Sequence, residues 1–366
     1  MGVGRSAGRG ARLGRRGFLA GLLAAGGAPQ VGWAALGMPA FVSGARLSDG
    51  ATVISGVSAA GDILFDIPTP ARCHAGAAHP RRAEIVVFAR RPGTFAQVIA
   101  CESGDVRQEL SAPLGHHFYG HGAFSSDGTR LFTTENHIEG GGGRVGVWDV
   151  GAGYRRLGSF ATGGIGPHEI LRGPGDVLIV ANGGIRTHPD RGREKLNLDT
   201  MAPSIAYLDP GGKLLEEVAL MPDMHQLSLR HIAVTQGGTL AVGGQWQGDP
   251  WDPPPMVWTH RRGGPLAPVA GARSLGTYVG SVAWSDGETA IAATAPRAGV
   301  ALMLDPEAGA VWRAAMDDIC GVAPRPGGVL FTTGTGVVLP VGRGAGPRRE
   351  LARQWDNHVT AIPCAG

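Results

Sequence analysis

The stretch HGAFSSDGTRLFTTE, residues 121–135, contains the pattern that decides the fold. A polar residue opens a short apolar run, a glycine-containing turn follows, and a second apolar run comes after the turn. This order predicts two short antiparallel strands joined by a tight turn. The pattern recurs as HEILRGPGDVLIVAN (168–182), HIAVTQGGTLAVGGQ (231–245), SVAWSDGETAIAATA (281–295) and CGVAPRPGGVLFTTG (320–334).

Related units begin upstream at His74 and near the C-terminus at His358, which makes seven units separated by 38–63 residues. Repeats of about 40–50 residues with short strands and glycine turns indicate a β-propeller built from four-stranded blades. We predict an all-β, seven-bladed propeller of the YVTN/WD40-like kind. The long interval between His168 and His231 leaves six or eight blades open.

The unit that begins at His358 ends before it can form a second strand. Apolar runs at 41–46, 52–57 and 63–67 are predicted to be the missing strands. Pairing them with the C-terminal strand closes the ring and leaves fewer free sheet edges. We therefore expect residues 41–366 to form a single propeller domain after a leader and linker at 1–40.

The composition excludes several classes of protein. The 62 glycines and 26 prolines disfavour long helices. The formal charge of +3 depends on Arg5, Arg9, Arg12, Arg15 and Arg16, because acidic residues slightly outnumber basic ones in the rest of the chain. We therefore expect no nucleic-acid partner.

The leader contains paired arginines, Arg15 and Arg16, followed by an apolar run from Phe18 to about Ala28. This is typical of bacterial twin-arginine export and predicts a periplasmic protein. An ordinary secretory signal or an uncleaved anchor is the alternative. The run is shorter than the roughly 20 residues that span a bilayer, so we expect no transmembrane domain in the mature chain.

The sequence resembles the bacterial domain-of-unknown-function family 1513 over about residues 41–362. The resemblance is carried by RPGTFA (91–96), HFYGHGAFSSDG (117–128), TTENHIEGGGGRVGVWD (133–149), GIGPHEI (164–170), ANGGIRTHPDRGREKLNLDTM (181–201), LSLRHIAV (227–234), YVGSVA (278–283), DICGVA (318–323) and WDNHVTAI (355–362). It implies an exported seven-bladed propeller without an agreed activity. It also implies an association with iron uptake, with imelysin-type and dihaem-cytochrome-type periplasmic proteins as partners.

Equivalent positions in successive blades form a ring around the central channel. The residues that open the units are His74, His121, His168, His231, Ser281, Cys320 and His358. Imidazole is a common ligand of zinc, copper and iron, and thiolate favours the softer ions. We predict a metal site formed by the five histidines and Cys320, with Glu169 as a further ligand or an acceptor. The alternative is that each histidine only ties its blade to a neighbour.

A second candidate site is the charged segment 183–201, which should form a long loop on one face of the propeller. It is a predicted ligand-binding or partner-binding loop, since guanidinium groups match carboxylates. Internal salt bridges could instead satisfy all its charges. Its candidate residues are Arg186, His188, Asp190, Arg191, Arg193, Glu194, Lys195 and Asn197.

The function favoured by these features is a binding or accessory protein of periplasmic metal handling, with iron as the metal. A lactonase-like metal-dependent hydrolase and a metal-free interaction scaffold are the alternatives, and no catalytic residue is assigned. The four cysteines, Cys73, Cys101, Cys320 and Cys364, lack CxxC or CxxCH spacing, so neither haem attachment nor a redox dithiol is expected. The glycines at 141–146 precede a strand, which argues against a nucleotide site.

Overall fold

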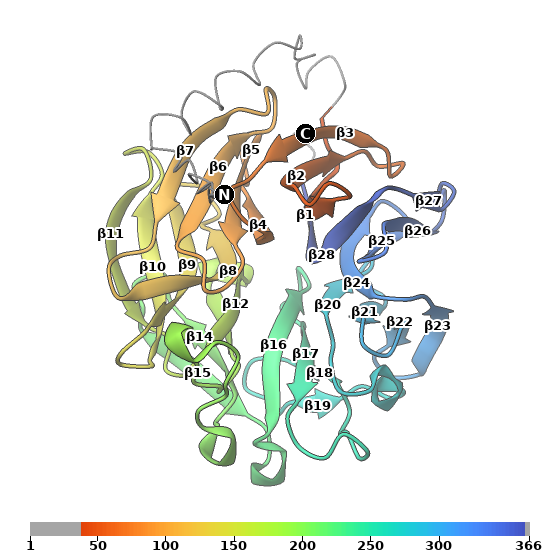
Figure 1. Cartoon of the computed structure of the whole chain (residues 1–366). Coiled ribbons are helices and arrows are strands. Elements are labelled where there is room, and N and C mark those ends of the chain that lie inside the picture. Colours follow the sequence, from red (N-terminus) through yellow and green to blue (C-terminus); the bar gives the residue numbers. More distant parts are fainter. Residues whose placement is uncertain (1–37, 363–366) are drawn as a thin grey trace, which may run out of the picture.

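The computed structural model describes residues 38–362, which form seven four-stranded sheets arranged as blades around a central axis (Figure 1). The chain is therefore an all-β, seven-bladed propeller, as the repeats predict. Within each blade the strands pair antiparallel. Regular helix is limited to the short 3-10 turns η1 (Pro174–Asp176), η2 (Pro189–Arg191), η3 (Leu198–Thr200), η4 (Pro222–Met224) and η5 (Ala272–Leu275) in the described part of the chain.

Each predicted opening residue lies on the innermost strand of a blade. These strands are β4 (Cys73–Ala78), β8 (His116–Phe124), β12 (Pro167–Arg172), β16 (Leu227–Val234), β20 (Ser281–Trp284), β24 (Ile319–Arg325) and β28 (Arg353–Ala361). In β8, β16 and β28 the strand begins before the histidine, because residues ahead of it also join the ladder. The histidines therefore lie within the channel and do not mark its mouth.

The other strands follow outward from the axis in chain order. The second strands are β5 (Glu84–Ala89), β9 (Arg130–His137), β13 (Leu178–Asn182), β17 (Leu240–Trp246), β21 (Ile291–Ala295) and β25 (Gly328–Thr333). The third strands are β6 (Phe95–Ala100), β10 (Gly143–Asp149), β14 (Ser204–Leu208), β18 (Val257–His260), β22 (Val300–Asp305) and β26 (Val337–Gly342). The outermost strands are β7 (Val106–Ser111), β11 (Arg155–Ala161), β15 (Leu214–Ala219), β19 (Ala267–Pro268), β23 (Gly309–Ala315) and β27 (Arg349–Glu350).

The seventh blade joins the two ends of the described chain. Its strand order is β28-β1-β2-β3, with β1 (Phe41–Leu47), β2 (Thr52–Val57) and β3 (Ile63–Pro68) supplied by the N-terminal side. β1 pairs with β28 from Phe41 opposite Ala361 to Leu47 opposite Arg353. The predicted three-plus-one closure is thus confirmed, and each predicted strand ends within one residue of its observed end.

Turn chemistry explains how the repeated unit folds. In the β8–β9 turn, Asp127 Oδ1 accepts hydrogen bonds from Ser125 Oγ and the Thr129 backbone nitrogen. Gly128 then has φ of 72°, in the left-handed region that favours glycine. A side chain there would also meet the His79 imidazole, since an added Cβ would lie 2.3 Å from its Cε1. Both constraints select glycine at this position.

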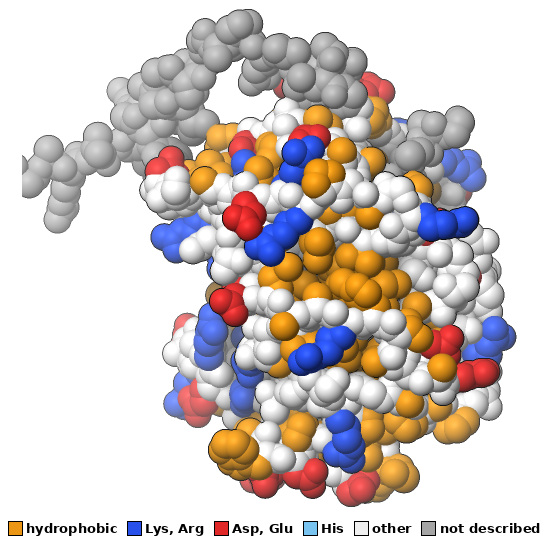
Figure 2. Space-filling model, turned by 90° about the vertical axis from the view of Figure 1, so that its right-hand side faces the viewer, with side chains coloured by type: hydrophobic (Ala, Val, Ile, Leu, Met, Phe, Trp, Pro, Cys, Tyr) orange, Lys and Arg blue, Asp and Glu red, His pale blue; other side chains and the backbone are white. Residues whose placement is uncertain are grey.

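The apolar core lies between neighbouring blades. Its largest cluster combines side chains of the β12, β16 and β20 blades, including Ile179, Val242 and Ile291. The outer wall is mixed: Figure 2 shows hydrophobic side chains gathered in the middle of one side, with charged side chains scattered around them. Burial between blades therefore holds the ring together, and the centre remains available for polar side chains.

Several predictions concern residues outside the described part. Arg15 and Arg16 of the predicted signal, and Cys364, lie there. Cys73, Cys101 and Cys320 are buried and free within residues 38–362. Across the same residues, none of the helices has the length and apolar character needed to cross a membrane.

Candidate metal centre

β-bulges displace the ladder at the candidate residues. The pairing register shifts between Phe118 and Gly122 in β8, between Pro167 and Glu169 in β12, and between Leu229 and His231 in β16. Similar shifts occur in β4, β24 and β28. A bulge bends its strand and re-aims the local side chain. Six of the seven innermost strands therefore depart from regular alternation beside their opening residue.

Five imidazoles meet at the axis: His74, His121, His168, His231 and His358, together called the histidine cluster. All five are buried, with exposed fractions of 9% or less. Their ring centroids lie 4.5–6.3 Å apart in eight pairs. The seven-bladed channel is thus filled at this level by imidazole.

Two overlapping triads bring ring nitrogens within metal-binding range. His74, His121 and His358 offer one nitrogen each, all within 4.8 Å of one another, and His121, His168 and His231 do the same. Tetrahedral ligation with bonds of about 2.0–2.1 Å requires donor spacings of roughly 3.3 Å. The 4.8 Å limit is wider than this spacing, so tetrahedral binding would draw the more distant nitrogens closer together. His121 is the member that both triads share.

Several imidazole nitrogens lack hydrogen-bond partners. His121 Nε2, His358 Nε2 and both ring nitrogens of His231 are buried without a hydrogen bond to any described residue. A buried polar atom left unsatisfied costs about 1–3 kcal/mol. A bound ion would provide a partner for these nitrogens. The histidine cluster therefore has nitrogen ligands for a metal ion, and binding an ion would remove the cost of leaving those nitrogens without partners.

Two carboxylates contact the cluster from its sides. Glu169 lies between blades, with Oε1 3.6 Å from His121 Nδ1 and Oε2 3.4 Å from His231 Nδ1. Asp356 Oδ1 lies 3.7 Å from His74 Nδ1. Carboxylates beside the second nitrogen of an imidazole fix its orientation in many metal sites. Glu169 thus lies beside two imidazoles without a hydrogen bond to either of them in the described structure.

Burial governs the charge of these groups. Desolvation lowers the pKa of His121, His168, His231 and His358 well below the usual value, and it lowers that of His74 less because Asp356 opposes it. The imidazoles are thus neutral near pH 7, the form that ligates metals. Burial also raises the pKa of Glu169 to about 8. For Asp356 burial acts to raise the pKa, but His74, Arg90 and Arg72 together lower it.

The cluster separates two cavities along the channel. Residues ahead of the cluster in the innermost strands, with loops around them, line a cavity of about 700 Å³ that reaches His74 and His168. Residues that follow it line a second cavity of about 480 Å³ that reaches His121, His358 and Glu169. The imidazole layer thus forms part of the wall of both cavities.

Two opening residues do not join the triads. Cys320 Sγ points to the backbone oxygens of Asp356 at 3.5 Å and Trp355 at 3.9 Å, where it ties β24 to β28. Burial raises the pKa of its thiol, which disfavours the thiolate that binds metals. Ser281 lines the 480 Å³ cavity.

The segment 183–201 joins β13 to β14 and contains no strand. Asn197 accepts from the Arg186 backbone nitrogen and donates to the Gly184 carbonyl, Arg191 pairs with Glu194, and His188 lies 3.8 Å from Asp190. Internal contacts therefore occupy part of the loop. His188, Arg193 and Lys195 line the 700 Å³ cavity, whereas the other five candidate residues do not.

Sequence reasoning missed several residues of this region. Arg90, Arg91, Arg230 and Arg297 line the 700 Å³ cavity from three different blades, with Arg90 and Arg91 in one loop between β5 and β6. One signal was present, because Arg230 directly precedes the opening residue His231 and Asp356 lies two residues before His358. Arg90, Arg91 and Arg297 do not lie next to an opening residue, so the repeat pattern could not predict their place in the cavity.

The buried imidazoles predict an acid-sensitive fold when no metal is bound. Their pKa values are lowered on folding, so the unfolded chain binds more protons below about pH 6.5 and stability falls there. Glu169 acts in the opposite direction, because its raised pKa favours the folded state as pH falls below about 8. Five imidazoles outweigh one carboxyl group. We expect the melting temperature of chelator-treated protein to drop clearly from pH 7 to pH 5.5; an unchanged or higher value would contradict this.

The fold and this centre define the protein as a seven-bladed β-propeller with a histidine-filled channel. The chain belongs to the family described as protein of unknown function (DUF1513), whose model matches residues 67–362. No curated protein matches the sequence.

Solved structures share the architecture at low identity. A chain of the Kuenenia stuttgartiensis hydrazine synthase is 16% identical, with a TM-score of 0.53 over 74% of this chain and 78% of that one. A chain of a mitotic checkpoint complex is 14% identical, with a TM-score of 0.56 over 77% and 79%. These similarities support the propeller fold alone.

Proposed function

We propose that the histidine cluster binds a transition-metal ion and that the protein is a binding or accessory protein of periplasmic metal handling. One observation carries the proposal: two imidazole triads share His121 and include buried ring nitrogens that have no hydrogen-bond partner within residues 38–362. An ion bound between these neutral imidazoles would give those nitrogens a partner.

The chemistry of the donors narrows the metal. Imidazole suits zinc, copper, iron and nickel, whereas calcium and magnesium prefer oxygen ligands. Iron is the choice favoured by the family resemblance, and the paired arginines at 15 and 16 support export to the periplasm. On this basis an imelysin-type or dihaem-cytochrome-type periplasmic protein is the proposed partner.

In this proposal the residues have separate tasks. His121 belongs to both ligand sets, with His74 and His358 on one side and His168 and His231 on the other. Glu169 lies beside the Nδ1 atoms of His121 and His231 and would orient both imidazoles. The two cavities give routes for an ion or its partner from either end of the channel.

Elemental analysis of the purified mature protein tests the proposal. We expect about one iron, copper or zinc ion per chain, and loss of that ion in His121→Ala, which removes a ligand from both triads. His137→Ala is the matched control, because this exposed histidine lies outside both triads. It should retain the metal.

The outcomes separate the alternatives. A parent protein that remains metal-free after incubation with each ion, yet melts cooperatively, would favour the interaction scaffold. Retention of the ion by His121→Ala would place the metal elsewhere and would also contradict the proposal. If the metal-loaded protein hydrolysed a lactone and the metal-free protein did not, the result would favour the hydrolase.

A further inference from the structure

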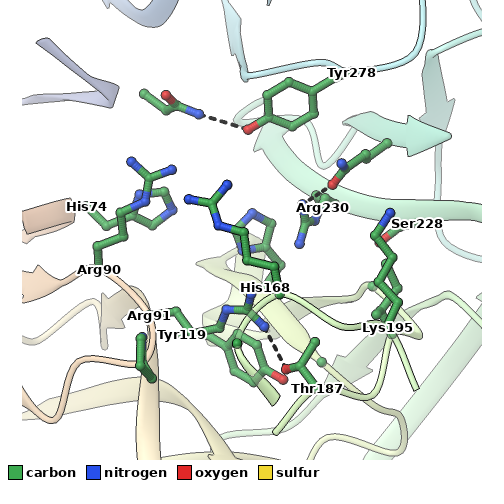
Figure 3. A pocket seen from close by; sticks show the side chains of 18 of the residues that line it. His74, Arg90, Arg91, Tyr119, His168, Thr187, Lys195, Ser228, Arg230 and Tyr278 are labelled. Atoms are coloured by element: carbon green, nitrogen blue, oxygen red, sulfur yellow. Dashed lines mark hydrogen bonds between the residues drawn. The ribbon is translucent and has the colours of Figure 1, made fainter. Parts of the chain in front are cut away.

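The 700 Å³ cavity is strongly basic. Its lining includes six cationic side chains, Arg90, Arg91, Arg193, Lys195, Arg230 and Arg297. Asp318 is the one acidic residue among its described lining residues. Figure 3 shows Arg90, Arg91 and Arg230 around one space, with His74 and His168 beside it. We call these six cationic side chains, with the space that they surround, the basic cavity.

Most of these charges are not compensated by the protein. Arg91 donates a 2.6 Å hydrogen bond to Thr187 Oγ1, and Arg230 donates to Gln245 Oε1. The Arg297 guanidinium lies 5.0 Å from the centre of the Tyr278 ring. These partners are neutral. Among the described residues, of the six cations, only Arg90 has a carboxylate within 4.0 Å, at 3.5 Å from Asp356 Oδ1.

Unsatisfied donors provide independent evidence for a ligand. Ser228 lines the basic cavity, is fully buried, and its Oγ has no hydrogen-bond partner among residues 38–362. Arg230 Nε is likewise buried and without a partner. Both groups can donate to an oxygen atom. The lining therefore combines surplus positive charge with hydrogen-bond donors that lack acceptors.

The size of the cavity restricts the ligand. A volume of about 700 Å³ lies within the range of small-molecule sites, roughly 300–1,000 Å³. It exceeds the needs of a single inorganic oxyanion. The five guanidinium groups come from four blades, so a ligand with two or more anionic groups can contact more of them than a ligand with one. Their planar donors match carboxylate and phosphate oxygens.

We propose that the basic cavity binds a small organic polyanion with two or more carboxylate or phosphate groups. The ligand lies beside His74 and His168, on one side of the histidine cluster. This inference does not depend on the proposed metal site, because every group that recognises the anion belongs to the protein.

Calorimetric titration of the full mature chain, freed of metal by a chelating resin, tests this inference. The probes are citrate, fructose 1,6-bisphosphate and acetate at low ionic strength. We expect at least one of the two polyanions to bind with 1:1 stoichiometry, more tightly than acetate and more weakly as salt is added. Binding of citrate alone assigns carboxylate, binding of the bisphosphate alone assigns phosphate, and binding of both assigns a site that accepts either.

The informative variant is Arg193→Gln/Arg297→Gln. Both arginines are exposed, and Arg297 lies against the Tyr278 ring at the surface of the cavity, so we expect the double variant to fold. Losing two charge-assisted contacts should weaken binding by about 10- to 100-fold or more. The matched control is Arg313→Gln, an exposed arginine on the outermost strand β23, which should bind like the parent.

Absence of binding by both polyanions, equal binding of acetate, or unchanged affinity in the double variant would each overturn the inference. His121→Ala distinguishes it from the metal proposal, because that variant should lose metal and still bind the anion.

Discussion

Trp355→Ala is expected to lower the free energy of unfolding by about 3–5 kcal/mol, the range for large aromatic side chains removed from a core. Trp355 is 2% exposed on β28, opposite Ala45 of β1, and packs in the cluster that contains Phe41, Val57 and Leu330. Arg353 covers its ring at 5.2 Å. Its removal leaves a cavity where the last strand meets the first.

Denaturant unfolding of Trp355→Ala and Trp251→Ala measures this effect against a matched control. Trp251 is 92% exposed, so its truncation should change the unfolding free energy by no more than about 0.5 kcal/mol. Equal losses in the two variants would show that packing at the closure does not determine stability. A larger loss at Trp355 would show that it does.

Arg156→Met is expected to destabilise the fold by about 3 kcal/mol, because it leaves a buried carboxylate unpaired. Glu135 is fully buried on β9, and Arg156 of β11 donates to its two oxygens at 2.6 and 2.8 Å. Thr133 Oγ1 also donates to Glu135 and itself accepts from Trp148 Nε1. The ion pair thus belongs to a hydrogen-bonded network across one blade.

Chemical denaturation of three variants checks this interpretation. Glu135→Gln/Arg156→Met should recover part of the loss, since the buried charge is gone. Arg348→Met is the control, because its ion pair with Glu350 is solvent-exposed and such pairs contribute about 0–1 kcal/mol. If Arg156→Met were no more damaging than Arg348→Met, the buried pair would not matter for stability.

The basic cavity lies next to the histidine cluster, so the proposed anion and metal sites would be neighbours. The anion site borders His74 and His168, each of which belongs to one of the two proposed ligand triads. A polyanion bound there would place its oxygen atoms close to the proposed metal. Titrating the anion into metal-free and metal-loaded protein would measure whether the two sites are coupled.

The sequence by itself determined the propeller, because the repeated strand–turn–strand pattern is local. Apolar runs and turn residues such as Gly128 specify strands within the unit, and the lone unit at His358 requires partners from the N-terminal side. The equivalence of blades also placed the five histidines around one axis, since each occupies the same position in its repeat.

The tertiary structure alone decided which of those residues come together and in what state. Only five of the seven opening residues bring imidazoles together at the axis, whereas the Cys320 thiol lies against a backbone oxygen of β28, outside the triads. The basic cavity depends on Arg90, Arg91 and Arg297, which lie in loops far apart in the chain. The physical reason is that local pattern fixes strands, whereas distances across a channel and the loss of water there depend on the packing of all seven blades.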